Sequence, residues 1–142
     1  MTGETYTVLR KSPSVGTPSD WIRRAHADLA LAKGSLPPGA LFDDLCFHAQ
    51  QAAEKAIKAV YISAGRGFRY THNLGFLIDE LRGSGVRVPE YIDDAAELTK
   101  WAWEARYPGP LEPASEAEYQ RALALAERVV EWAESMVDKG EA

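Results

Sequence analysis

The sequence predicts an all-α protein, an up-and-down four-helix bundle with one additional short helix. Apolar residues recur at three- and four-residue steps in five segments, each bounded by capping residues, glycines or prolines. No segment alternates apolar and polar residues with period two, which is the pattern of a half-buried strand. The connections between the segments are short, and short connections favour antiparallel neighbouring helices, as in a bundle.

The composition fits a single folded domain. The chain has 142 residues, of which 46% are hydrophobic and 26% are charged, and this balance is sufficient for one core. The formal net charge of −5 argues against a protein that coats nucleic acid through bulk positive charge. Residues 1–16 show no sustained period, so we expect them to form a flexible leader, with residues 17–139 forming the bundle.

The first two helices are predicted after Thr17 and over residues 41–64. Thr17 and Asp20 form a capping-box pattern, and Gly34 closes the first helix. The second helix stops at Gly65, in the position of a left-handed C-cap. On a helical wheel, one half of this helix is apolar and rich in alanine, which predicts a central position in the bundle: Leu45, Cys46, Ala49, Ala52, Ala53, Ala56, Ile57, Ala59 and Val60. The other half is polar: His48, Gln50, Gln51, Glu54, Lys55 and Lys58.

The remaining three helices follow from similar signals. Thr71 is the expected cap of a short third helix, whose apolar stripe is Leu74, Leu77, Ile78 and Leu81. The fourth helix is expected from Pro89 to Tyr107, where the following proline ends it. Its apolar stripe is Tyr91, Ala95, Leu98, Ala102 and Ala105. Ser115 and Glu118 form a capping box for the fifth helix, which extends up to residue 140.

Several classes of protein and site are not expected. Cys46 is the only cysteine and lies on the apolar half of the second helix, so we expect a buried residue in a reducing, cytoplasmic protein. No stretch approaches the roughly 18 apolar residues of a membrane span. His26 and His48 have no carboxylate or cysteine at ligand spacing, and phosphate-binding glycine motifs do not occur, so no metal or cofactor is predicted.

The connection between the second and third helices is the best local candidate for an anion site. The cations on it and on the preceding polar face are Lys55, Lys58, Arg66, Arg69 and His72. A guanidinium matches phosphate oxygens, and His72 can act as acid, base or donor near neutral pH. Phe68 and Tyr70 could stack on a base. The alternative is a basic surface loop in which Arg66 and Arg69 complement the negative end of the helix dipole, while His72 helps to cap the next helix.

A second candidate anion site lies at the end of the fourth helix. Arg106 and Tyr107 follow Trp101, Trp103 and Glu104 along the chain. Arg106 suits a ligand phosphate or carboxylate, and the alternative is that it packs over a tryptophan face or pairs with Glu104. Trp101 and Trp103 are two residues apart and point to different sides of the helix, so one of them is expected at an interface.

Three blocks of sequence carry a family resemblance. They are QQAAEKAIKA at residues 50–59, THNL at residues 71–74 and ARYP at residues 105–108. In order and spacing they resemble the HEPN (higher eukaryotes and prokaryotes nucleotide-binding) domain, over about residues 19–138. The resemblance implies a helical bundle that usually forms a homodimer. In bacteria and archaea it also implies a partner, a minimal nucleotidyltransferase, in a toxin-antitoxin pair.

The resemblance leaves two main hypotheses for function. Many HEPN domains are ribonucleases that use an Arg-x(4 to 6)-His motif from a dimer cleft. Here no histidine follows Arg106 within residues 107–112, whereas Arg66 and His72 have the spacing but lie before the third helix. The first hypothesis is a nucleotide- or RNA-binding homodimer that pairs with a nucleotidyltransferase. The second is a metal-independent ribonuclease toxin, with Arg66 or Arg106 stabilising the phosphate charge and His72 as general base. A purely structural helical dimer is the third reading.

Overall fold

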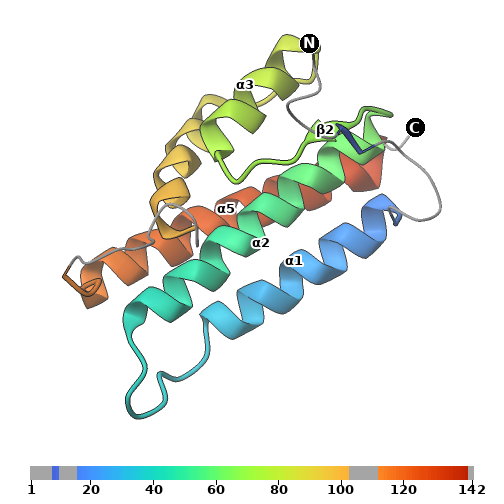
Figure 1. The fold of residues 1–142 in the computed structure, drawn as a ribbon. Helices are drawn as coiled ribbons and strands as arrows, with labels where there is room; N and C mark the ends of the chain where they lie inside the picture. Colours follow the sequence, from blue (N-terminus) through green and yellow to red (C-terminus); the bar gives the residue numbers. More distant parts are fainter. Residues whose placement is uncertain (1–7, 10–15, 103–111, 141–142) are drawn as a thin grey trace.

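The computed structural model describes residues 8–9, 16–102 and 112–140, and the described part is mostly helical (Figure 1). Its helices are α1 (Pro18–Ala32), α2 (Phe42–Ser63), α3 (Leu74–Gly83), the 3₁₀ helix η2 (Glu90–Trp101) and α5 (Glu116–Gly140). The strands β1 (Val8–Leu9) and β2 (Phe68–Arg69) have two residues each. The all-α prediction is therefore confirmed.

Helix α2 occupies the centre of the bundle. It packs against α1 and α5 along its length and also contacts η2 and α3. Figure 1 shows α1, α2 and α5 side by side, with α3 and η2 lying over one side of this layer. The alanines of α2 are fully buried: Ala49, Ala52, Ala53, Ala56 and Ala59. Small side chains let the neighbouring helices approach closely, so the predicted central position of this helix is confirmed.

Local capping signals set most helix ends. The Thr17 hydroxyl accepts a hydrogen bond from the Asp20 amide, and the Asp20 carboxylate accepts one from the Thr17 amide, each at 3.1 Å. Gly65 follows α2 with φ +75°, as its predicted C-cap role requires. The predicted cap of α3 was wrong by two residues. Asn73 caps the helix by accepting from the Phe76 amide, whereas the Thr71 hydroxyl accepts from the Asn73 amide in the preceding turn.

The predicted fourth helix differs from the structure in type and length. Residues Glu90–Trp101 form a 3₁₀ helix, and Ala102 after it is extended at φ −68° and ψ 148°. The buried side chains recur every three residues, which is the repeat of a 3₁₀ helix: Ile92, Ala95, Leu98 and Trp101. Tyr91, expected on the apolar stripe, is instead 51% exposed. The expected positions Ala105 and Tyr107 lie outside the described residues.

A short antiparallel pair of strands was not predicted. Val8 pairs with Arg69 and Leu9 with Phe68. Val8 and Leu9 belong to the stretch expected to precede the core, and a two-residue strand gives too few positions for a period to be recognised. The pairing places Val8 and Leu9 next to the connection between α2 and α3 (Figure 1). Among the described helices, none combines the length and apolar character needed to cross a bilayer.

Candidate functional site

The polar half of α2 is largely buried, although the helical wheel shows it only as the polar side of an amphipathic helix. Gln50, Glu54 and Lys58 are 0%, 4% and 6% exposed. They lie four residues apart and therefore on one stripe of the helix. The neighbouring elements α3 and η2 also contact α2. Buried polar groups need hydrogen-bond partners, and each of these three side chains has at least one within the described residues.

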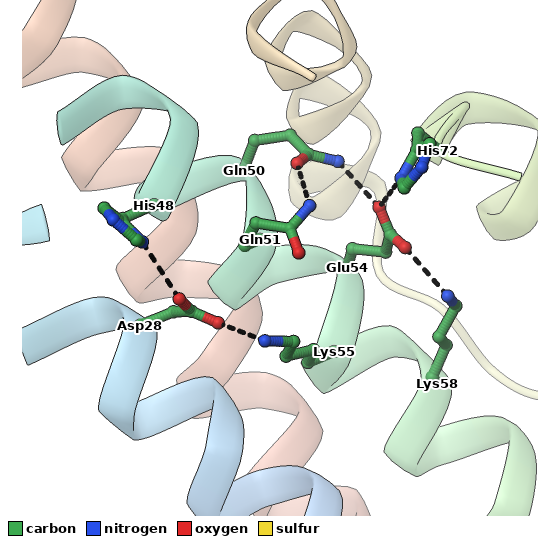
Figure 2. A network of polar contacts seen from close by, with 8 residues as sticks. All are labelled: Asp28, His48, Gln50, Gln51, Glu54, Lys55, Lys58 and His72. Atoms are coloured by element: carbon green, nitrogen blue, oxygen red, sulfur yellow. Dashed lines mark hydrogen bonds and ion pairs between the residues drawn. The ribbon is translucent and has the colours of Figure 1, made fainter. Parts of the chain in front are cut away.

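Glu54 is the centre of this polar stripe (Figure 2). Its Oε1 accepts a hydrogen bond from Gln50 Nε2 at 2.8 Å and lies 2.8 Å from His72 Nδ1. Its Oε2 accepts a hydrogen bond from Lys58 Nζ, also at 2.8 Å. Gln51 Nε2 in turn donates to Gln50 Oε1 at 2.7 Å. One carboxylate thus connects α2 with the segment that precedes α3.

The Glu54 carboxyl is held in its ionised form. Burial raises its pKa, but the Lys58 charge and the hydrogen bonds from Lys58, His72 and Gln50 outweigh burial, so the pKa of Glu54 lies below its ordinary value. An ionised carboxylate only accepts hydrogen bonds. The proton between His72 and Glu54 therefore sits on Nδ1 of His72, which fixes both the tautomer and the direction of the ring.

Lys58 is enclosed by aromatic rings as well as paired with Glu54. Its Nζ lies 5.9 Å, 5.0 Å and 5.6 Å from the ring centroids of Trp21, Phe68 and Tyr70. Each distance is within the range of cation–π attraction. The side chain of Lys58 is only 7% exposed. This ammonium therefore has a structural role, and little of it is accessible to a ligand.

A second network with the same components lies beside the first (Figure 2). Asp28 of α1 is buried, and its Oδ2 accepts a 2.6 Å hydrogen bond from Lys55 Nζ. Its Oδ1 lies 3.0 Å from His48 Nδ1. His26 similarly contacts Glu134 at 2.9 Å. Both histidines thus have carboxylate partners on other helices, which the sequence spacing did not indicate. No group of three or more metal-ligating side chains occurs within the described residues.

The two networks border a pocket of about 220 Å³. Its wall comes from α1, α2 and the segment before α3, and the residues lining it are Trp21, Gln51, Glu54, Lys55, Lys58, Tyr70, Thr71 and His72. Tyr70 is 72% exposed, although a large aromatic side chain is costly to leave in water. The side chains of Lys55 and His72 are 30% and 40% exposed. The pocket thus combines aromatic surface with one accessible ammonium and an oriented imidazole.

The structure brings together only some of the predicted site residues. Lys55, Lys58 and His72 line the pocket, whereas Arg66 and Arg69 do not. Arg66 Nη2 donates to the Ser84 carbonyl at 3.1 Å, at the end of α3. Arg69 Nε lies 3.7 Å from Glu80 Oε2, with its guanidinium 4.9 Å from the Phe76 ring centroid. Phe68, expected to stack on a base, is 1% exposed and belongs to the core. Arg106 and Tyr107 lie outside the described residues.

Several lining residues were not predicted as site residues: Trp21, Gln51, Glu54 and Thr71. The four-residue step from Glu54 to Lys58 does indicate an ion pair on one helix face. Trp21 carries no comparable signal, because its position beside Lys58 follows from the packing of α1 against α2. Asp28 is 27 residues from Lys55 and is likewise placed by that packing.

Comparison with known proteins gives a consistent family and fold. The HEPN domain matches residues 18–136. The crystal structure of TT1696 from Thermus thermophilus is similar, with 34% identity, a TM-score of 0.71, and coverage of 83% of this chain and 96% of that one. The crystal structure of ST0689, an archaeal HEPN homologue, has 25% identity, a TM-score of 0.67, and coverage of 86% and 98%. No curated protein matches the chain.

Proposed function

This chain belongs to the HEPN domain family, and we propose that it is a nucleotide- or RNA-binding module whose ligand occupies the pocket beside Lys55 and His72. The observation that carries the proposal is the composition of that pocket. Tyr70 offers an exposed ring for stacking with a base, and base–aromatic stacking contributes about 1–3 kcal/mol per base. Lys55 offers a cation for a phosphate, and Nε2 of His72, whose Nδ1 carries the proton, offers an acceptor for a hydroxyl of the ligand.

Binding and its site can be tested together. Titration calorimetry with AMP and with a short single-stranded RNA should give a signal that Tyr70→Ala weakens by roughly tenfold or more, because the stacking surface is lost. Tyr91→Ala is a matched control, since Tyr91 is also an exposed tyrosine but does not line the pocket. Equal binding by the wild type and the Tyr70 variant would place the ligand elsewhere.

The proposal includes a homodimer that pairs with a minimal nucleotidyltransferase in a toxin-antitoxin system of the cytoplasm. This part of the proposal is supported by membership of the HEPN family, because the family resemblance implies such partners. Phe47 on α2 is half-buried and packs edge-on against His48, so it offers apolar surface for a subunit contact. Tyr61 on the same helix offers no such surface, because it is buried and its hydroxyl donates to the Leu77 carbonyl.

Assembly is tested by light scattering and by the neighbouring gene. A homodimer should scatter as twice the 15.6 kDa chain at micromolar concentration. A monomer at high micromolar concentration would remove the basis for a shared cleft. A gene for a minimal nucleotidyltransferase beside this one supports the paired system, and co-expression with that protein followed by size-exclusion chromatography tests whether the two bind each other.

The alternative function is a metal-independent ribonuclease, and the contact between His72 and Glu54 is the observation that supports it. A buried carboxylate holds Nδ1 of a histidine that lines the pocket, which is how proteins orient a general base. If His72 is the base, His72→Ala should lower RNA cleavage by about 10²-fold or more. His26→Ala is the control, because His26 also contacts a carboxylate but does not line the pocket. Equal activity in both variants would eliminate His72 as the base.

A further inference from the structure

The charges at the pocket limit which nucleotides it suits. Each lysine of the wall is paired with a buried carboxylate, Lys55 with Asp28 and Lys58 with Glu54. Together these four side chains carry no net charge. A ligand with several negative charges therefore meets no excess of cations on the described wall, and it lies close to two carboxylates.

The two lysines also differ in what they offer to a ligand. Lys58 has a 7% exposed side chain, and its ammonium is enclosed by Glu54 and the aromatic rings. Lys55 is 30% exposed, and its hydrogen bond within the described residues goes to Asp28. An ammonium has three N–H donors, so Lys55 keeps two of them for a ligand. One accessible ammonium matches one phosphate group.

The size of the pocket also limits the size of the ligand. Sites for drug-sized ligands typically enclose roughly 300–1,000 Å³. At about 220 Å³ this pocket is smaller, so it suits one base rather than an extended ligand. Tyr70 provides the exposed aromatic surface, while Gln51 and Thr71 add polar groups to the wall.

We infer that the pocket selects a single nucleoside monophosphate unit, with its base on Tyr70 and its phosphate on Lys55, and discriminates against nucleoside triphosphates. The inference rests on the proposed nucleotide- or RNA-binding function and specifies its ligand. The additional phosphates of a triphosphate gain no further accessible ammonium on the described wall, and they are repelled by Asp28 and Glu54. The same unit occurs as a free nucleotide and as one residue of single-stranded RNA, whose bases are open for stacking.

Calorimetry with four probes tests this inference: adenosine, AMP, ATP and the RNA trinucleotide AAA, in low salt without divalent cations. AMP should bind about tenfold more tightly than adenosine, because of the Lys55 contact. ATP should bind more weakly than AMP, because its additional phosphates gain no further accessible ammonium on the described wall. If the trinucleotide binds more tightly than AMP, the natural source of the unit is RNA, and if it binds more weakly, the source is a free nucleotide. Both results agree with recognition of a monophosphate unit.

The variant Lys55→Gln separates the phosphate contact from a loss of structure. It should weaken the binding of AMP by about tenfold and leave the binding of adenosine nearly unchanged, since adenosine has no phosphate. Lys33→Gln is the control, because Lys33 also pairs with a carboxylate, Glu127, but does not line the pocket. Equal weakening of AMP and adenosine by Lys55→Gln would overturn the assigned contact.

Two further results distinguish failure of the inference from failure of the proposed function. ATP binding as tightly as AMP, or more tightly, would overturn the monophosphate preference, while nucleotide binding itself would stand. If none of the four probes gives a heat of binding at millimolar concentration, the proposed binding function is overturned, and the inference with it.

Discussion

Replacing Glu54 by Gln tests the buried network most directly. The substitution keeps the size of the side chain but removes the charge that lies 2.8 Å from Lys58 Nζ. Removing one partner of a buried ion pair costs about 3–5 kcal/mol, because the other charge stays buried without compensation. Cation–π contacts with the surrounding aromatic rings offset about 0.5–2 kcal/mol of this cost. We therefore expect the free energy of unfolding to fall by about 3 kcal/mol.

Thermal unfolding followed by circular dichroism measures this loss. For a domain of this length, 1 kcal/mol corresponds to about 3–4 °C in Tm, so Glu54→Gln should lower Tm by roughly 10 °C. Glu97→Gln is the matched control. Glu97 also accepts charged hydrogen bonds from Arg121, but both side chains are exposed, and such pairs contribute little to stability. A Glu54 variant that melts within about 2 °C of the wild type would refute the reasoning.

A double-mutant cycle identifies the cause of the loss. If the uncompensated Lys58 ammonium destabilises Glu54→Gln, then adding Lys58→Met should restore part of the stability, because methionine leaves no buried charge. A double variant less stable than Glu54→Gln alone would show that packing around Lys58, rather than its charge, is responsible.

Three further predictions concern the fold. The pKa of Glu54 is lower in the folded state than in the unfolded state. Its contribution to stability is therefore present above the unfolded pKa of about 4.3 and is lost as pH falls through the folded pKa. Urea titrations from pH 6 to 3 should show a steeper loss of stability for the wild type than for Glu54→Gln. Ala56→Leu on buried α2 should cost about 1–3 kcal/mol, whereas Ala30→Leu at an exposed position of α1 should leave the melt unchanged. Gly65→Ala should lower the free energy of unfolding by about 1 kcal/mol because of the φ of +75° alone, since an added Cβ meets nothing within 4 Å. Gly83→Ala is the control, because Gly83 has the same free space without a positive φ, and equal melting temperatures of the two variants would contradict the role of Gly65 as a cap.

Most of the α-helices could be predicted from sequence because their signals are local. A capping box such as Thr17 with Asp20 involves residues three apart, and it operates in the structure as the spacing indicates. The stripe of α3, from Leu74 to Leu81, likewise depends only on helical period. Bounds that follow from neighbours in sequence need no knowledge of the rest of the fold.

The 3₁₀ helix shows a signal that was present but misinterpreted. The prediction combined steps of three and four starting from Tyr91, as for an α-helix. The buried residues from Ile92 to Trp101 instead keep a constant step of three. A constant step of three over four buried positions favours a 3₁₀ helix, because residues three apart in an α-helix rotate progressively away from the buried face. 3₁₀ runs longer than about four residues are uncommon, and this one contacts α2, α3 and α5.

The candidate site was harder to predict because charge at a site depends on partners distant in sequence. The density of cations from Lys55 to His72 suggested a positive cluster. In the structure Lys55 pairs with Asp28 and Lys58 with Glu54, while Arg66 binds a carbonyl at the end of α3. A local excess of basic residues therefore does not by itself produce an anion site. What distinguishes the pocket is which cation remains accessible after these pairings, and accessibility follows from how α1 packs on α2.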